Sequence, residues 1–213
     1  LPFVLSHLPQ LELWSGNWDR AEDYAQRHLE AAVRSGQHDQ ASQARTNLAL
    51  IDIHRGMLDT ARALASRIRD DGVAGDDAWT ERSGLGLLGL IAMADGDAEQ
   101  AVGHLGRWHE LAEQMALREP GYCRFQADYV EALIATGRLD EAERYVAMMR
   151  DRAAALQRAT AAAIAARVDA LLLAARGERD RAVEQATGAV DALAASPLVV
   201  EHARALMSLG QIH

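Results

Sequence analysis

Residues 84–89 read Gly-Leu-Gly-Leu-Leu-Gly, the G-x-G-x-x-G spacing found where backbone amides cradle the phosphates of a dinucleotide. That use requires a β-strand before the glycines and a βαβ unit around them. Here the glycines stand inside a run with helical periodicity, and Gly89 occupies a position where a small residue recurs along the chain. We therefore interpret them as helix-packing residues and predict no cofactor.

The absence of lysine removes several further kinds of chemistry. All 22 residues counted as lysine or arginine are arginine. A P-loop, the ATP-binding lysine of protein kinases and Schiff-base catalysis all depend on a lysine amine. Serines are few and none stands in a G-x-S-x-G context. Because we find no clustered nucleophile, base and oxyanion donors, we predict that the chain is not an enzyme.

The histidine and aspartate clusters lack the spacing of metal sites. His104 and His109 are five residues apart, about 140° around a helix, so they do not share a face as the histidines of an H-E-x-x-H zinc site do. We expect His109, Glu110 and Glu113 on a solvated face. Residues 70–77, with aspartates at both ends, lack the alternating ligands and terminal glutamate of a calcium loop. We predict no metal there and interpret the stretch as a mobile loop.

Charge and cysteine content indicate the partners and the compartment. A net charge of −9 repels nucleic-acid phosphates and anionic membrane surfaces, so we predict no direct nucleic-acid or membrane binding. Cys123 is the single cysteine, which excludes an intrachain disulfide and favours a cytoplasmic location. Although Cys123 precedes Arg124 at an expected helix start, we interpret it as a structural cysteine. The chain starts Leu-Pro-Phe, without Met or a signal-peptide pattern, which we interpret as a cut from a longer chain.

Five copies of a six-residue pattern, G-x-x-[DE]-x-A, organise the whole chain. The copies begin at Gly16, Gly56, Gly96, Gly137 and Gly177, with spacings of 40, 40, 41 and 40 residues. Glycine can adopt the left-handed backbone that ends a helix, and the acid three residues later suits the first turn of the next helix. The following alanine lets the two helices approach closely. The pattern therefore predicts a helix-turn-helix unit of about 40 residues.

An apolar stripe on the first helix of each unit completes the predicted contact. Small residues mostly stand seven positions before the glycine: Pro9, Ala49, Gly89, Val130 and Ala170. Larger apolar residues mostly stand five before it: Leu11, Ile51, Ile91, Ala132 and Leu172. We expect both rows to be buried.

These patterns predict one all-α domain over residues 1–213, an α-solenoid of five helix-turn-helix units with a terminal helix. The units lie near 1–35, 38–70, 78–116, 121–157 and 159–195, and the terminal helix is 198–213. First helices are expected near 3–15, 38–55, 78–95, 121–136 and 159–176, and second helices near 18–35, 58–70, 98–116, 139–157 and 179–195. An apolar face formed by Leu198, Val199, Leu206 and Leu209 is a candidate for pairing two copies into a homodimer.

The turn pattern, with a small residue seven before each glycine and leucine eight before the first three, resembles the tetratricopeptide repeat. Residues 117–182, including Leu117-Arg118-Glu119-Pro120-Gly121 and Gly137-Arg138-Leu139-Asp140-Glu141-Ala142, resemble the helical-repeat region of large LuxR-type transcriptional regulators of high-GC bacteria. That resemblance implies an ATPase module before the repeats and a DNA-binding helix-turn-helix after them. It also implies a regulatory or sensor role in which the repeats bind a small inducer or a partner protein. The alternative is a free-standing scaffold that binds a peptide or protein.

A concave face is the expected binding surface of such an array. In the tetratricopeptide register this face carries the first-helix positions thirteen, ten, six, three and two before each glycine. Its polar or aromatic members are Trp14, Gln43, Thr46, His54, Arg124, Glu131 and Arg167. Arg124 and Glu131 are two helical turns apart, and Arg167 occupies a neighbouring slot in the next unit. These three residues are therefore our predicted site for a carboxylate or phosphate, although the same residues could simply form salt bridges.

Overall fold

The computed structural model describes residues 5–122 and 124–213, and within these ranges the chain is helical and contains no β-strand. The predicted all-α repeat fold is therefore confirmed. Cys123 and residues 1–4 lie outside the described ranges. The chain divides into two compact units, residues 1–111 and 112–213.

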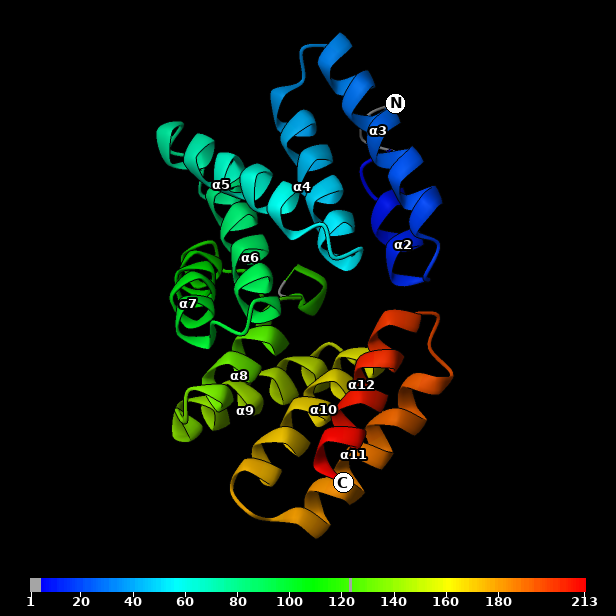
Figure 1. Ribbon diagram of the computed structural model, residues 1–213, viewed down its shortest axis with the longest axis vertical. Coiled ribbons are helices and arrows are strands. Elements are labelled where there is room, and N and C mark those ends of the chain that lie inside the picture. The colour runs from blue at the N-terminus through cyan, green and yellow to red at the C-terminus, as the bar shows by residue number, and fades with distance from the viewer. Residues whose placement is uncertain (1–4, 123) are drawn as a thin grey trace. The chain divides into compact units, whose positions relative to one another are not determined.

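The first unit contains α2 (Leu8–Trp14), α3 (Trp18–Arg34), α4 (His38–His54), α5 (Leu58–Ala74), α6 (Ala78–Ala94) and most of α7 (Ala98–Gln114). The helices α3 to α7 each have 17 residues, and three residues connect each of them to the next. Two such helices and connections give the 40-residue period of the sequence. Consecutive helices pack side by side, and α4 also contacts α6 (Figure 1).

The second unit contains a short 3₁₀ turn (Pro120–Tyr122), α8 (Gln126–Ala135), α9 (Leu139–Ala155), α10 (Ala159–Ala175), α11 (Arg179–Ala194) and α12 (Val199–Ile212). Within it, α10 packs against α8, α9, α11 and α12, so it is the central helix of the unit. The first helix of this unit was expected at 121–136. It instead starts at Gln126, because the 3₁₀ turn and a two-residue turn occupy the preceding positions.

The five repeat glycines adopt the predicted left-handed conformation, with φ between 74° and 83°. At Gly56 the glycine N–H donates to the Ile53 carbonyl at 3.0 Å, and the Met57 N–H donates to the Asp52 carbonyl at 2.9 Å. This pair of bonds is a Schellman motif, which satisfies carbonyls that the end of α4 would otherwise leave unpaired. The acid of the pattern lies in the first turn of the next helix in all five units.

The small residues of the pattern make the closest helix contacts. The five pattern alanines are all 0% exposed: Ala21, Ala61, Ala101, Ala142 and Ala182. Gly89 lies so close to α7 that an added Cβ would stand 2.4 Å from the Cγ atom of Leu105. Gly84, also in the G-x-G-x-x-G segment, leaves only 2.4 Å between an added Cβ and the Arg69 backbone nitrogen. These two glycines therefore pack α6 against both of its neighbours.

Residues 70–77 do not form the predicted loop. The α5 helix continues to Ala74, and the turn is confined to Gly75, Asp76 and Asp77. Asp77 caps α6 by accepting hydrogen bonds from the backbone N–H groups of Trp79 and Thr80. The acidic run stays helical because Gly72 lets α5 pack against the start of α6, where burial outweighs the low helix propensity of glycine and aspartate.

Three further expectations about exposure are wrong. Leu11 is 61% exposed, because no described helix precedes α2 to cover it, whereas its equivalents in later units are buried. His109 is buried in α7, not solvated. Leu209 packs partly buried against a core cluster that includes Ala170 and Ile212, while Val199 and Leu206 are exposed as expected.

The close approach at Gly72 gives a direct test of this packing. We expect Gly72→Ala to lower the free energy of unfolding by at least about 1–3 kcal/mol, because an added Cβ would stand 2.2 Å from the Glu81 backbone nitrogen. Gly103→Ala, within α7, meets nothing within 4 Å and should instead stabilise by about 0.5–1 kcal/mol. Urea denaturation of both variants measures the difference. A stable Gly72→Ala variant would contradict the packing described.

Candidate functional site

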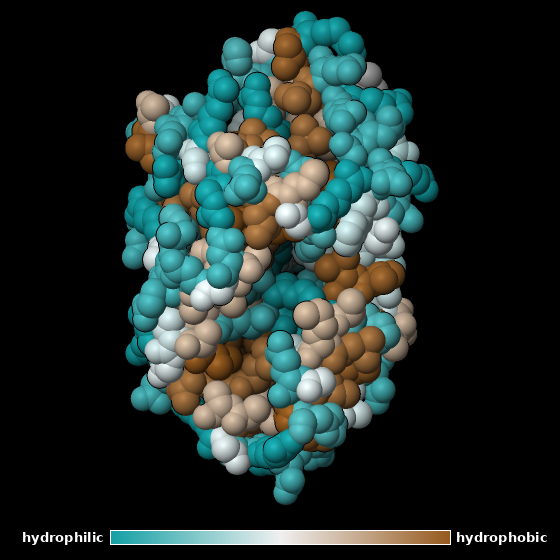
Figure 2. Space-filling view, in the orientation of Figure 1, coloured by the Kyte–Doolittle hydropathy of each residue, from teal (hydrophilic) through white to brown (hydrophobic). Residues whose placement is uncertain are grey.

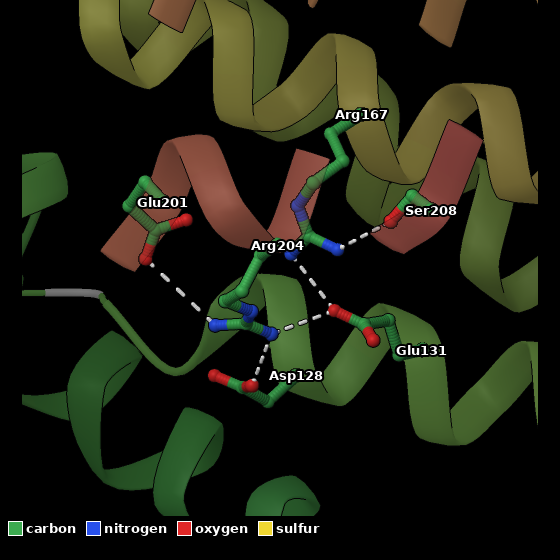
Figure 3. Close-up of polar contacts among 6 residues, drawn as sticks. All are labelled: Asp128, Glu131, Arg167, Glu201, Arg204 and Ser208. Carbon is green, nitrogen blue, oxygen red and sulfur yellow. Dashed lines mark hydrogen bonds and ion pairs between the residues drawn. The ribbon is translucent and has the colours of Figure 1, made fainter. Parts of the chain in front are cut away.

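Charged side chains from three helices of the second unit converge around Glu131 (Figure 3). The α8 helix supplies Asp128 and Glu131, and the central helix α10 supplies Arg167. The terminal helix α12 supplies Glu201, Arg204 and Ser208, which are spaced so that they share one helix face. We call these six residues the charged network.

Glu131 lies between the two arginines of the charged network. Its Oε1 atom is 2.8 Å from Nη2 of Arg167 and 2.7 Å from Nη2 of Arg204. The Arg204 Nη2 group also donates a 2.6 Å hydrogen bond to Asp128. Arg167 Nη1 donates to the hydroxyl oxygen of Ser208 at 3.3 Å. The network therefore ties α12 to α8 and α10, over sequence separations of up to 76 residues.

Burial makes these contacts strong and raises the cost of leaving a charge unpaired. The Arg167 side chain is only 1% exposed, and Asp128 and Glu201 are also buried. Removing one member of a buried ion pair typically costs about 3–5 kcal/mol, because the remaining charge cannot regain its hydration. An Arg167→Ala substitution would therefore destabilise the fold. A loss of ligand binding in that variant would not by itself show that Arg167 contacts the ligand.

The charged network holds three carboxylates and two guanidinium groups, and its pKa shifts follow from this imbalance. Burial raises the pKa of Asp128 despite the attraction of Arg204, and burial likewise raises the pKa of Glu201. Burial also disfavours the charged form of Glu131, but Arg167 and Arg204 together outweigh it and lower the pKa of Glu131. Glu131 is thus the carboxyl group of the network whose charged form its neighbours favour.

Arg124 lines a cavity of about 40 Å³ in the second unit. The cavity is enclosed by residues from the segment before α8 and from α8, α9 and α10, including Gln126, Met149, Arg152 and Ile164. The predicted trio is therefore divided, with Glu131 and Arg167 in direct contact and Arg124 at the cavity. Arg152 and Gln126 were not among the predicted residues.

The predicted residues of the first unit include an aromatic contact. The rings of Trp14 and His54 meet edge to face with centroids 5.7 Å apart, and Trp18 lies 6.0 Å from His54. Gln43 and Thr46 lie half-buried on α4, where the Thr46 hydroxyl donates to the Ser42 carbonyl. Trp14 and His54 thus come together from α2 and α4.

Two absences hold for the described residues alone. Residues 5–122 and 124–213 contain no group of three or more histidine, cysteine, aspartate or glutamate side chains arranged to hold a metal ion. No helix within the same ranges combines the length and apolar character needed to cross a membrane.

Comparison with known proteins agrees with the tetratricopeptide-like class that the repeat geometry defines. The fold is similar to a crystal structure of a kinesin light chain from Podosopora anserina with nearly identical TPR-like repeats. The TM-score is 0.61 at 16% sequence identity, over 90% of this chain and 93% of that one. No family model matches the sequence. No curated protein matches it either. The likeness therefore establishes the fold.

The imbalance of the charged network predicts a pH dependence of stability. Because the pKa of Asp128 is raised on folding, the folded state retains a proton more readily than the unfolded chain does. The contribution of this retained proton to the folding stability is fully present below pH 3.8, and it is lost as the pH rises through the raised pKa of Asp128. The stability of Asp128→Asn relative to the parent should therefore rise from pH 4 to pH 7, as measured by urea titrations across this range.

The exposed Asp151, on α9 of the same unit, provides the control substitution Asp151→Asn. We expect its stability difference from the parent to stay constant over the same pH range. An Asp128→Asn variant that loses stability relative to the parent as the pH rises would show that charged Asp128 is favourable, which contradicts a raised pKa.

Proposed function

We propose that this chain is a binding module that recognises a protein segment or a small inducer and performs no catalysis. The observation that supports this proposal is the fold itself, a tetratricopeptide-like array whose helix contacts are made by small buried residues. Such packing uses one face of each first helix and leaves other positions available for a partner. Concave surfaces of repeat arrays are common binding faces.

In the first unit we propose that Trp14, Gln43, Thr46 and His54 contribute to the binding surface. The Trp14–His54 contact supplies an apolar platform with a polar edge, which suits a peptide side chain. Gln43 adds an amide, which can both donate and accept hydrogen bonds to a peptide backbone. In the second unit we propose the surroundings of Arg124, Glu131 and Arg167 as the corresponding region.

We further propose that the module belongs to a LuxR-type transcriptional regulator, in which the repeats sense an inducer or a partner. The support for this is the resemblance of residues 117–182 to that repeat region, together with the lysine-free, alanine-rich composition. A free-standing scaffold that binds a peptide or protein is the second candidate, favoured by the similarity of the fold to kinesin light chain repeats. The complete reading frame distinguishes them, because only the regulator has a P-loop ATPase upstream and a helix-turn-helix downstream.

We also propose the exposed part of α12 as the contact of a homodimer. Val199, Leu206 and Met207 are large apolar side chains exposed on this helix, and Figure 2 shows apolar surface over it. Sedimentation analysis of the parent and of Leu206→Glu tests this proposal. Dimers in the parent that dissociate in the variant support it, and a monomeric parent at millimolar concentration contradicts it.

The peptide-binding proposal predicts the effect of one surface substitution. Peptides selected from a random library against the purified chain should bind saturably at micromolar concentration. Gln43→Ala should weaken that binding by about five- to tenfold, the cost of one lost hydrogen bond at an interface. Calorimetry with the selected peptides measures the change.

Gln100→Ala is the matched control, because Gln100 is exposed on the second helix α7 and lies outside the proposed surface. Its peptide affinity should equal that of the parent. If no peptide is selected, or if Gln43→Ala and Gln100→Ala bind the selected peptides equally well, the proposed surface is wrong.

A further inference from the structure

The cavity beside Arg124 contains buried hydrogen-bond donors that lack acceptors. Gln126 is only 4% exposed, and its Nε2 atom has no hydrogen-bond partner among the described residues. The Arg152 side chain is 12% exposed, and its Nη1 atom likewise has no described partner. Both residues line the cavity. Buried donors are normally paired in folded proteins, so the cavity calls for an occupant that accepts hydrogen bonds.

The charges around the cavity favour a negatively charged occupant. Arg152 donates from its other terminal nitrogen to Glu113 at 2.6 Å, but Glu113 is shared with Arg118 at 2.9 Å. One carboxylate thus serves two guanidinium groups. No carboxylate of the described residues lines the cavity itself, whereas Arg124 does. This part of the molecule therefore has a local positive excess in a chain whose net charge is −9.

The size and walls of the cavity narrow the class of ligand. A volume of about 40 Å³ corresponds to roughly three water-sized positions, which limits the occupant to a small molecule. The terminal nitrogens of arginine can bind a planar carboxylate at two points. Met149 and Ile164 supply an apolar wall, which suits the short alkyl part of a small acid.

We propose that this cavity binds the carboxylate group of a small organic acid. Arg152 Nη1 and Gln126 Nε2 donate hydrogen bonds to the carboxylate oxygens, and the alkyl group of the acid contacts Met149 and Ile164. This proposal rests on the proposed binding function, and it identifies the small inducer as an organic acid. It differs from the pairing of Arg124, Glu131 and Arg167 that the sequence predicts, because Glu131 already neutralises Arg167.

The test uses the whole chain and follows the methyl resonances of Met149 and Ile164 by NMR at constant ionic strength. Acetate, propionate and butyrate should each give saturable shifts that chloride does not give. Arg152→Met should weaken propionate binding at least tenfold, and Arg150→Met, an exposed arginine on the same helix, should leave it unchanged. Equal binding of the three acids and of inorganic phosphate would overturn the proposal, because it would indicate a general anion site.

A second variant keeps the test decisive if Arg152→Met fails to fold. Gln126→Glu places a carboxylate of the chain itself beside the unpaired donors. It should raise Tm and abolish propionate binding. An unchanged propionate affinity in this variant, or a parent that gives no saturable shifts because water alone fills the cavity, would overturn the proposal. If selected peptides still bind in that case, the carboxylate site is wrong and the proposed function stands; if neither ligand binds, both fail.

Discussion

The structure depends on close approach between helices at positions where the side chain is almost absent. The five pattern alanines are fully buried. Gly72 and Gly84 bring helix backbones closer than a Cβ would allow, and Gly89 leaves room for the Leu105 side chain. Interiors pack to crystal-like density, so one methyl group added at such a position forces its neighbours to shift. Close approach also explains why acidic residues 70–71 stay helical. The regular helix length and the 40-residue period both follow from repeating this contact.

The sequence predicts this part of the fold well because its determinants are local. A glycine with positive φ and an acid in the first turn act within one turn and recur at fixed spacing. The turns at the other end of each unit are harder to predict, because Gly36, Asp76 and Gln157 adopt left-handed conformations without a shared residue type. The prediction of a loop at 70–77 was wrong because helix propensity is a local property. It does not include the tertiary contact between Gly72 and the backbone of α6.

The residues of the charged network also differ in how far the repeat pattern identifies them. Glu131 and Arg167 occupy neighbouring slots of the repeat, so the sequence points to both of them. Arg204 and Ser208 join them from α12, which lies outside the repeat pattern and whose apolar residues are the more conspicuous feature of its sequence. The polar spacing of residues 201, 204 and 208 on one face was the available signal. The cavity gave no such signal, because it depends on where side chains of three helices leave space.

The two polar regions of the second unit have opposite charge balances, and this difference decides what each can do. The charged network has more carboxylates than guanidinium groups, and its ion pairs join α12 to α8 and α10, so it fixes α12 in place. The cavity has more guanidinium groups than carboxylates, and two of its donors lack internal acceptors among the described residues. Ion pairs between helices favour a structural role for the network, whereas unpaired donors beside an open volume favour a ligand in the cavity. Because Ile164 lines the cavity and Arg167 belongs to the network, α10 is the helix that the two regions share.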